Sequence, residues 1–326
     1  MASPRVYTLG RLIVDLYGVE IGVDLTRVER FAKYVGGSAA NTAVGLARLG
    51  VATGMIARVG HDPFGRYLLA ALAREGVDTR MTTMDPALPT GLAFAALRPP
   101  DDSEVAFYGV PNANATLNAE DLHRETLSQA KFLVVGGTAL ASPSSSEAVL
   151  AALDCHRRAG GVNILDVDWR PAFWVDPAAA RGVYRRALAL TDLVLSNEPE
   201  LTFVAEGREG SAAAEHLYAL GVGELVAKRG AAGVDYYSPR QQLSCPAFSV
   251  PVLNTLGAGD GFAAGWVAAL ADNVSVPQAL RFASAVAAIV VSRHGCSAAM
   301  PTRTEVSQFL ARQSTMDAAQ KGGEAL

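Results

Sequence analysis

The chain has 326 residues, half of them hydrophobic and 18% charged, with a formal net charge of −4 at pH 7. This composition is typical of a soluble globular protein with a large core, and the acidic balance gives no support for binding to nucleic acid or to an anionic membrane. The three cysteines are scattered and form no C-x-x-C pair. The chain has no apolar signal segment at its start and no apolar run near the ~20 residues that cross a bilayer. These features favour a cytoplasmic protein with reduced thiols.

The first part of the chain is expected to form short strands and two helices. Gly50 stands where the first helix would end in a left-handed cap, Gly76 lies just past the end of the second, and Asp62 and Pro63 are typical of a helix start. In chain order, these predicted elements are the strands Val6–Leu9 and Val14–Val23, the helix Ser38–Leu49, the strand Met55–Val59 and the helix Asp62–Glu75.

Residues 89–111 have a different pattern. Two strands, Gly91–Arg98 and Glu104–Tyr108, are predicted around a turn of two prolines and two aspartates at positions 99–102. Together with residues 11–35, they could form a small β sheet that projects from the core as a lid. The alternative is an antiparallel extension of the main sheet, and the sequence does not separate the two arrangements.

From residue 132 onward, strands and helices alternate. This alternation predicts βαβ crossovers and an α/β fold with a doubly wound, mostly parallel sheet, in which ligands bind at the carboxyl ends of the strands. The predicted strands are 132–135, 162–167, 193–195 and 224–227, and the predicted helices are 147–159, 177–190, 212–220, 258–270 and 276–293. We therefore expect a core of residues 1–10, 36–88 and 112–313, a lid of residues 11–35 and 89–111, and a flexible tail at 314–326.

The strongest local signal for chemistry is the run Asn254-Thr255-Leu256-Gly257-Ala258-Gly259-Asp260-Gly261-Phe262, which leads into an apolar helix. Its small residues let the backbone approach a ligand, and the free N–H groups of a helix start suit a phosphate. Asp260 would face the same pocket and could take the proton of a hydroxyl that attacks a phosphoryl group. The helix dipole is expected to lower the pKa of Asp260 and make it a weak base. A glycine turn before an acidic residue is equally compatible with a structural role.

Two other nucleotide-binding motifs are missing. The chain has no G-x-x-x-x-G-K-[ST], which excludes a P-loop kinase. Phe262 stands where a dinucleotide-binding motif needs Gly or Ala, which disfavours a nicotinamide dehydrogenase.

Two motifs at opposite ends of the chain resemble the signatures of the PfkB, or ribokinase-like, carbohydrate kinases. Gly36-Gly37-Ser38-Ala39-Ala40-Asn41 is similar to the N-terminal G-G-x-x-x-N, and residues 257–260 are similar to the C-terminal G-A-G-D. The resemblance covers residues 5–312. It implies an enzyme that uses ATP and Mg²⁺ to phosphorylate a primary hydroxyl of a small-molecule sugar or sugar acid. Relatives of this kind often dimerise through the lid, so a homodimer is expected.

The resemblance also implies roles for individual residues. Asp260 matches the catalytic base, and the anion hole would be formed by Gly257, Ala258 and Gly259. By position, the substrate-binding residues would be Asp15, Gly36, Gly37, Asn41, Tyr108 and Arg170. Taken alone, Asp15 could equally be a turn residue and Asn41 an amide on a helix surface.

On the nucleotide side, Asn197-Glu198-Pro199-Glu200 resembles the family's N-x-x-E motif, in which Glu200 would position Mg²⁺ through water. The same spacing also fits a helix cap. Lys228, Gly230 and Gly233 resemble a strand–turn–strand that borders the nucleotide. Asn254 replaces an Asp that helps to hold a monovalent cation in many relatives. Because an amide oxygen binds K⁺ less strongly than a carboxylate, this change leaves activation by K⁺ open.

The run from Asp166 to Trp174 bears on the substrate. Arg170 could bind a carboxylate or phosphate, or it could tie the loop to a nearby Asp. The run is similar to the D-x-D-x-R-P-x-x-W of 5-dehydro-2-deoxygluconokinases, as are residues 14–18 and 31–38, so 5-dehydro-2-deoxy-D-gluconate is the lead substrate. Gly109 stands where such sugar-acid kinases often carry an arginine, for which Arg98 is a candidate substitute.

Several alternatives therefore stay open. Within the kinases, the acceptor could be 2-keto-3-deoxygluconate, fructose, ribose or a nucleoside. Outside them, the fold could serve a non-catalytic sugar-sensing protein, although the intact run from Gly257 to Asp260 argues against this.

Overall fold

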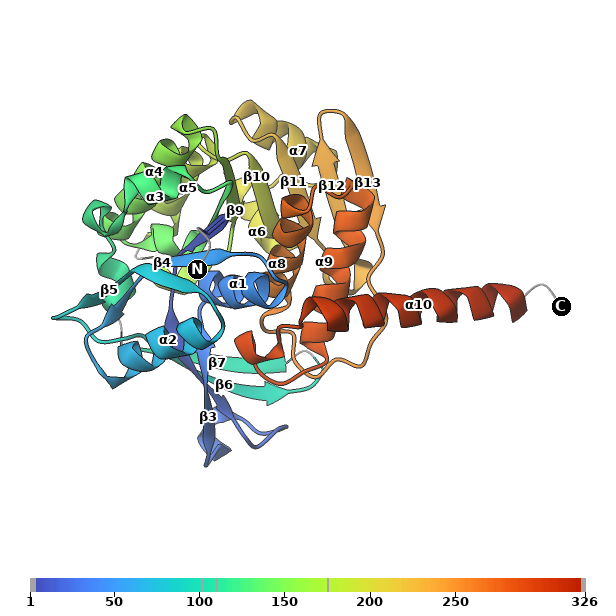
Figure 1. Cartoon of the computed structure of the whole chain (residues 1–326), viewed down its shortest axis with the longest axis horizontal. Helices are drawn as coiled ribbons and strands as arrows, with labels where there is room; N and C mark the ends of the chain where they lie inside the picture. The colour runs from blue at the N-terminus through green and yellow to red at the C-terminus, as the bar shows by residue number, and fades with distance from the viewer. Residues whose placement is uncertain (1–3, 101, 110, 175, 324–326) are drawn as a thin grey trace.

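The computed structural model describes residues 4–100, 102–109, 111–174 and 176–323, and its main feature is a large sheet with the strand order β13-β12-β11-β10-β9-β8-β1-β4-β5 (Figure 1). Neighbouring strands are parallel from β11 to β5, and β12 and β13 add an antiparallel edge. The strands are β1 (Val6–Leu9), β4 (Thr53–Gly60), β5 (Asp78–Asp85), β8 (Phe132–Gly136), β9 (Val162–Asp166), β10 (Leu193–Asn197), β11 (Glu224–Lys228), β12 (Val234–Ser238) and β13 (Gln241–Cys245). The predicted doubly wound α/β fold is confirmed.

A second, smaller sheet has the strand order β3-β2-β6-β7. Its strands are β2 (Ile13–Gly18), β3 (Phe31–Gly36), β6 (Leu92–Arg98) and β7 (Asp102–Tyr108). β2 and β6 are parallel, whereas β2–β3 and β6–β7 are antiparallel pairs. These strands pair with one another and not with the large sheet, so they do not extend it. We call this small sheet the lid.

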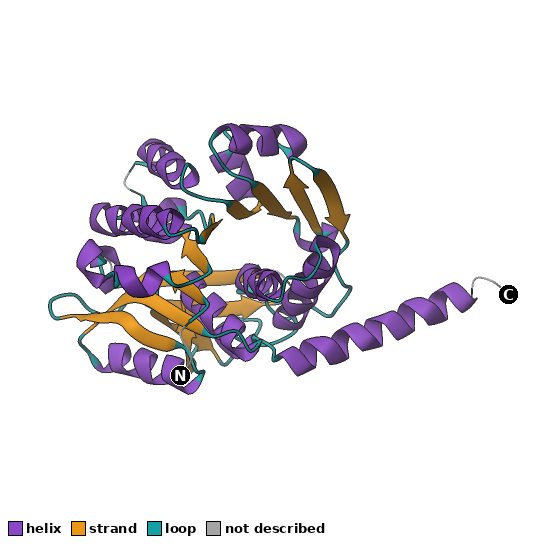
Figure 2. Cartoon of the chain, turned by 45° about the horizontal axis from the view of Figure 1, so that its top comes forward, coloured by secondary structure: helices purple, strands orange, loops and turns teal. Residues whose placement is uncertain are grey.

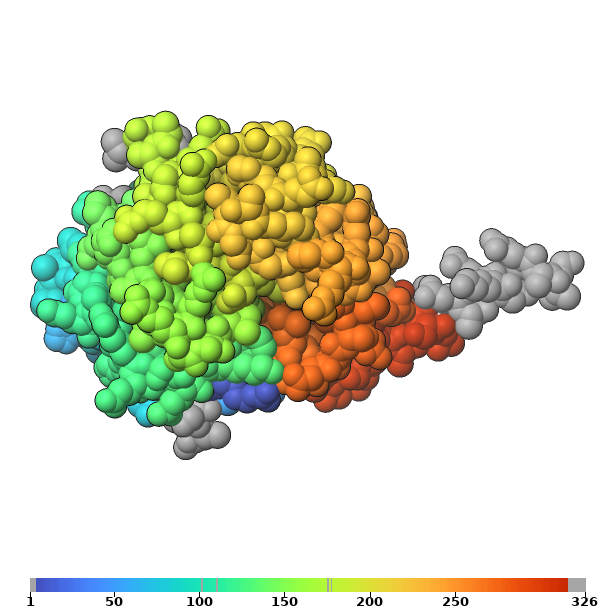
Figure 3. Space-filling view, turned by 90° about the horizontal axis from the view of Figure 1, so that it is seen from above, coloured from blue at the N-terminus to red at the C-terminus, as the bar shows by residue number. Residues whose placement is uncertain are grey.

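Helices cover both faces of the large sheet (Figure 2). They are α1 (Ser38–Arg48), α2 (Pro63–Arg74), α3 (Arg124–Ser128), α4 (Pro143–Arg158), α5 (Pro177–Leu188), α6 (Glu198–Val204), α7 (Gly210–Ala219), α8 (Ala258–Ala271), α9 (Val276–Val291) and α10 (Arg303–Gly323). Helices α4 to α7 pack on one face and form much of the green to yellow surface in Figure 3, whereas α1, α8 and α9 pack on the other.

Strand β8 shows why both faces need cover. Leu133 and Val135 point to the α4–α7 side, and Phe132 and Val134 point to the α8–α9 side. Because side chains alternate along a strand, a continuous apolar run buries both faces, and each buried side chain of this size contributes about 1.5–3 kcal/mol. Within the described part of the chain, no helix is long and apolar enough to cross a membrane.

The structure departs from the predicted elements in several places, and among them α3 and β13 were not predicted. β5 was not predicted because it is an edge strand rich in polar residues. The predicted strand Val14–Val23 ends at Gly18, where the chain turns before β3. Helix α10 continues through the expected tail as far as Gly323 and extends away from the rest of the molecule (Figure 1).

Candidate active site

A pocket of about 970 Å³ lies between the lid and the carboxyl ends of the central parallel strands. This volume is at the upper end of that of small-molecule sites. Ile13, Asp15 and Tyr17 of the lid line one part of it, and Phe248 and Val250 line another. Between these two walls, further charged side chains converge from four strand ends and from the start of α8.

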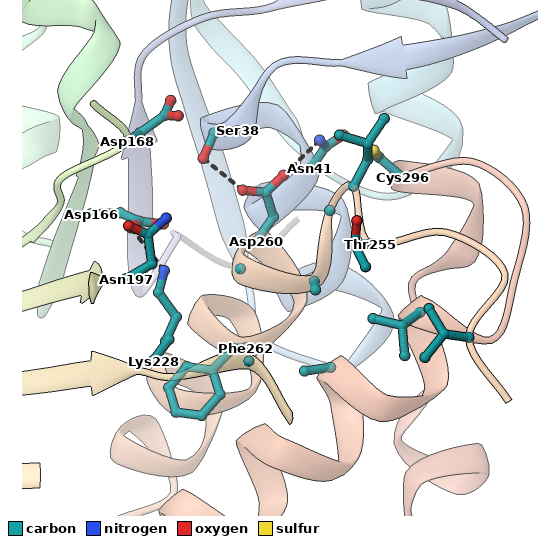
Figure 4. Close-up of a pocket in the computed structure, with 18 of the residues that line it drawn as sticks. Ser38, Asn41, Asp166, Asp168, Asn197, Lys228, Thr255, Asp260, Phe262 and Cys296 are labelled. Carbon is teal, nitrogen blue, oxygen red and sulfur yellow. Dashed lines mark hydrogen bonds and ion pairs between the residues drawn. The ribbon is translucent and has the colours of Figure 1, made fainter. Parts of the chain in front are cut away.

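Asp260 lies in the first turn of α8, at the centre of this polar region (Figure 4). Its Oδ1 accepts a hydrogen bond from Ser38 Oγ at 2.7 Å, and its Oδ2 accepts one from Asn41 Nδ2 at 2.8 Å. Both donors belong to α1, so the two motifs at opposite ends of the sequence meet at one carboxylate. Ser38 was not singled out from the sequence because its contact depends on the packing of α1 against α8.

The environment of Asp260 corrects the expectation of a lowered pKa. Burial raises the pKa of Asp260 to about 6, against the two hydrogen bonds from Asn41 and Ser38, which lower it. Desolvation therefore outweighs the favourable electrostatics of the helix start, and Asp260 is a stronger base than the helix dipole alone predicts.

The backbone before Asp260 approaches the pocket closely. Gly257 has φ +83°, and a Cβ on it would lie 3.0 Å from Cys296 Cβ. A Cβ on Gly259 would lie 3.3 Å from Lys228 Nζ. Because α8 begins at Ala258, the N–H groups of Gly259 and Asp260 have no partner inside the helix and are available to an anion, whereas Ala258 N donates to the carbonyl oxygen of Thr255 at 3.3 Å.

Beside this helix start, Lys228 comes from the end of β11 and Asp166 from the end of β9. Their Nζ and Oδ1 atoms are 3.1 Å apart, and burial raises the pKa of Asp166. Gly230 and Gly233 line the same region of the pocket. The parallel sheet thus brings residues that are 62 positions apart into one ion pair at its carboxyl edge.

Asn197 and Glu200 line the pocket and also cap α6. Glu200 Oε2 accepts from Asn197 N at 2.8 Å, and Asn197 Oδ1 accepts from Glu200 N at 2.9 Å. The capping arrangement left open by the sequence is therefore present. Burial raises the pKa of Glu200 to about 7, and the nearby Asp166 adds to this effect.

The carboxyl groups of Asp166 and Glu200 meet only part of the requirements of a Mg²⁺ site. Among the described residues, no group of three or more His, Cys, Asp and Glu side chains is placed to hold a metal ion. Asp166 nevertheless raises the pKa of Glu200, and Asp168 raises the pKa of Asp166, which a nearby cation would relieve. This donor set fits an ion that keeps most of its waters and takes further oxygens from phosphates.

On the sugar side of the pocket, the two glycines of the N-terminal motif stand where a side chain would clash with neighbouring atoms. A Cβ on Gly36 would lie 2.0 Å from Asp15 Oδ1, and a Cβ on Gly37, which has φ +95°, would lie 2.3 Å from the Arg11 carbonyl oxygen. Gly37 lines the pocket, whereas Gly36 lies behind Asp15 and leaves room for its carboxyl group. Burial raises the pKa of Asp15 to about 7.

The structure corrects the prediction for Tyr108. Alternate residues of β7 face the pocket, so Phe107 lines it, while Tyr108 points to the other face of the lid. The side chain of Tyr108 is 59% exposed, and its ring contacts Phe94. Arg98 does not replace the missing lid arginine at the pocket, because it forms an ion pair with Asp102 at 2.8 Å.

Two other predicted residues have partners of their own. Arg170 lines the pocket but its Nε lies 3.2 Å from Asp168 Oδ1, which is the loop-tying contact considered from the sequence. Asn254 is 1% exposed and does not line the pocket, although Thr255 next to it does. Its Nδ2 donates to the carbonyl oxygens of Leu256 and Gly295, at 3.4 and 3.3 Å.

Comparison with known protein families identifies the family to which this chain belongs. The model of the pfkB family carbohydrate kinases matches residues 3–303. The chain belongs to the PfkB family of carbohydrate kinases. This PfkB protein is a sugar kinase, and the alternatives outside the kinases are not supported.

Individual relatives agree with this result. The chain is 35% identical over 319 residues to a 5-dehydro-2-deoxygluconokinase of Geobacillus kaustophilus (strain HTA426), with 96% of this chain and 95% of that protein covered. It is 35% identical over 309 residues to a 5-dehydro-2-deoxygluconokinase of Bacillus anthracis, with 93% of each covered.

Solved structures of related kinases have the same fold. A fructokinase with bound ATP from Xylella fastidiosa aligns with a TM-score of 0.86 and 27% identity, over 95% of this chain and 99% of that chain. An E. coli protein provisionally assigned as ribokinase II, in complex with ATP and Mg²⁺, aligns with a TM-score of 0.88 and 28% identity, over 95% and 99% of the two chains. These neighbours support the use of ATP and a metal ion in this kinase family.

Proposed function

We propose that this kinase transfers the γ-phosphoryl group of ATP to a primary hydroxyl of a sugar acid, with 5-dehydro-2-deoxy-D-gluconate as the lead substrate. The relatives named 5-dehydro-2-deoxygluconokinase, which match nearly the whole chain, carry the proposal. Arg170 at the pocket supports it, because its side chain is 54% exposed and its fork has N–H groups beyond the one directed at Asp168.

In this proposal, Asp260 accepts the proton of the attacking hydroxyl. Its hydrogen bonds to Ser38 and Asn41 aim the carboxylate into the pocket, and its raised pKa makes it a better proton acceptor. Asp15, Gly37 and Asn41 bind and orient the sugar. Phe107 and the rest of the lid exclude water from the reacting groups.

The nucleotide side of the pocket would stabilise the negative charge of the phosphates. The amide groups of Gly257, Ala258 and Gly259 would bind the transferred group, and Lys228, next to Gly259, would add a positive charge. Asn197 and Glu200 would hold hydrated Mg²⁺ through water, with Gly230 and Gly233 beside the nucleotide. When bound, Mg²⁺ neutralises charge on the phosphate oxygens.

The proposal is tested by measuring ADP formation with purified enzyme and a panel of acceptors. We expect kcat/KM for 5-dehydro-2-deoxy-D-gluconate to exceed that for fructose and ribose by at least about tenfold, which corresponds to ~1.4 kcal/mol of differential binding. Higher kcat/KM for a neutral sugar would replace the lead substrate with fructose or ribose. Higher kcat/KM for 2-keto-3-deoxygluconate would keep the sugar-acid class and change the substrate within it.

The pH dependence of the reaction should follow the ionisation of Asp260. Because only the carboxylate can accept a proton, kcat/KM should rise with pH through about 6, the raised pKa of this group. Replacing Ser38 with Ala removes a donor that stabilises the carboxylate, so the acidic limb should move upward by roughly one pH unit. Ser38→Thr keeps the hydroxyl and should leave the limb near its original position. An unchanged limb in both variants would mean that another group controls it.

Asn254 is expected to make the enzyme independent of K⁺. Its amide nitrogen already donates to the carbonyl oxygens of Leu256 and Gly295, and its Oδ1 accepts from Leu256 N at 3.0 Å. In Asn254→Asp, a carboxylate oxygen would face these two carbonyl oxygens, which creates repulsion that a monovalent cation relieves. Turnover of the variant should therefore rise several-fold when K⁺ replaces a bulky organic cation, whereas turnover of the wild type should change less than about twofold. Equal responses of both enzymes would contradict this account.

A further inference from the structure

A cluster of polar side chains lies where the direction of strand addition reverses in the large sheet. β1 is flanked by β4 on one side and β8 on the other, and ligands of doubly wound sheets bind at the carboxyl ends of strands at such a point. Arg11 follows β1, Thr138 follows β8 and Asp168 follows β9. Thr138 Oγ1 accepts a hydrogen bond from Arg11 Nε at 3.0 Å and donates one to Asp168 Oδ2 at 3.0 Å.

Most hydrogen-bonding capacity of Arg11 remains unused. A guanidinium has five N–H groups, and within the described residues the one hydrogen bond found for Arg11 is that of Nε to Thr138. The Nη2 atom is 3.8 Å from Asp168 Oδ2, which is too long for a hydrogen bond. The side chain is only 14% exposed and lines the pocket, so the remaining N–H groups face a confined space rather than bulk water.

Aromatic rings hold Arg11 in place. Its guanidinium carbon lies 4.7 Å from the ring centroid of Phe173, in the loop after β9, and 5.3 Å from that of Phe107 in the lid. The two rings are themselves 5.0 Å apart in an edge-on contact. These contacts restrict the guanidinium to one region without using its N–H groups, which pre-organises them for a ligand.

The charge of the cluster favours an anion. Arg11 and Arg170 lie at the two different oxygens of the single Asp168 carboxylate, so the three groups carry a formal charge of +1. Asp168 has φ +37°, an uncommon backbone conformation for a residue other than glycine. An additional carboxylate would balance the charge of these three groups and accept hydrogen bonds from both arginines, while Asp15 and Asp260 also act on Arg11 from further away.

We propose that Arg11, together with Arg170, binds the carboxylate of the sugar acid, and that Arg11 is the residue that selects acids over neutral sugars. This inference rests on the proposed function, because it assigns a carboxylate subsite within the same pocket. In a gluconate, the carboxylate and the terminal hydroxyl lie at opposite ends of the carbon chain. With the carboxylate held at the β1–β8 reversal point, the other end of the chain would be free to reach Asp260, which lines the same pocket.

The test compares a sugar acid with a neutral analogue of the same shape. In Arg11→Met, Asp168 keeps Arg170 and Thr138 as partners, whereas buried Asp15 loses the nearby charge that lowers its pKa, an effect that the acid and its neutral analogue share. The substrates are 5-dehydro-2-deoxy-D-gluconate and its C1 carboxamide. We expect the KM for the acid to rise roughly 10- to 100-fold with kcat within about threefold of wild type, and the KM for the amide to change less than about threefold.

Three further variants sharpen the result. Arg11→Lys keeps the charge without the planar fork and should lie between wild type and Arg11→Met, and it serves if the methionine variant is unstable. Arg98→Met alters a lid arginine that pairs with Asp102 and should change neither KM. If both arginines bind one carboxylate, Arg11→Met and Arg170→Met should each weaken acid binding, and their effects should not add.

The outcomes separate this inference from the proposed function. If wild type prefers the acid but Arg11→Met weakens acid and amide equally, the carboxylate assignment is overturned and the sugar-acid substrate stands. If wild type uses acid and amide equally well, the carboxylate assignment fails; if it uses only neutral sugars, both proposals fail. Selective loss of acid binding, measured also by calorimetry without ATP, supports both.

Discussion

Replacing Asp260 with Asn should lower turnover roughly 10²- to 10⁴-fold while sugar binding is kept. Asn has nearly the same shape and can still accept a hydrogen bond from Ser38 or Asn41, so the pocket should keep its geometry. It cannot accept the proton of the attacking hydroxyl, because an amide oxygen is far less basic than a carboxylate whose pKa is about 6. Steady-state kinetics with varied sugar and saturating ATP would measure the effect as a fall in kcat at nearly constant KM.

The same variant should be at least as stable as wild type at pH 8. The pKa of Asp260 is raised by burial, so the folded state prefers the protonated carboxyl group. Its contribution to stability is therefore present below the ordinary pKa of about 3.8 and is lost as pH rises through about 6. A neutral amide removes this loss, and thermal melts at pH 8 should show an equal or higher Tm.

Asp272 offers a matched control at the other end of the same helix. It caps the C-terminus of α8 and pairs with Arg303 at 2.7 Å, far from the pocket lining. Asp272→Asn should leave turnover unchanged. If Asp260→Asn keeps wild-type turnover, or if both variants lose turnover equally, the assignment of Asp260 as the base is wrong.

Replacing Lys228 with Met should lower kcat/KM for ATP by roughly 10²- to 10³-fold. Lys228 Nζ lies close to the Gly259 backbone and pairs with Asp166, and burial opposes its charge while Asp166 and Glu200 raise its pKa. Without it, the phosphates would lose a cation, and Asp166 and Glu200 would repel them. Initial rates at varied ATP, and ATP binding measured by calorimetry, would show the loss on the nucleotide side.

A double variant separates the two roles of Lys228. Lys228→Met alone should also lower Tm, because Asp166 is only 5% exposed and would lose its partner. Adding Asp166→Asn should restore much of the Tm but not the use of ATP, since the positive charge is still missing. Lys131→Met, at an exposed residue that bonds to Asn273, is the control and should change neither quantity. Restored ATP use in the double variant would show that Lys228 acts only by neutralising Asp166.

Much of the fold follows from local patterns. The apolar runs at 132–135, 162–167, 193–195 and 224–227 correspond to β8 to β11, because strands buried on both faces must be apolar throughout. Gly50 takes a left-handed conformation after α1, as predicted, and Gly76 does the same after α2, since the absence of a Cβ removes the steric penalty. The edge strand β5 has no such run, and its position depends on pairing with β4.

The site was predictable only where a motif is continuous in sequence. The run from Gly257 to Asp260 indicates an anion-binding helix start from the local sequence alone, because small residues, a helix and a carboxylate are adjacent in the chain. Tyr108 lies outside the pocket because of the orientation of β7 in the lid, which decides which of its side chains point to the pocket. The pKa of Asp260 depended on burial that no local pattern reports.

The amino-acid sequence by itself therefore determined the α/β class, the PfkB-like motifs and Asp260 as the candidate base, since each depends on a pattern of residues along the chain. Only the tertiary structure brought Ser38 to Asp260 across 222 positions and Arg11 to Thr138 across 127 positions. The physical reason is that the order of strands in the sheet, and not distance along the chain, decides which strand ends share a pocket.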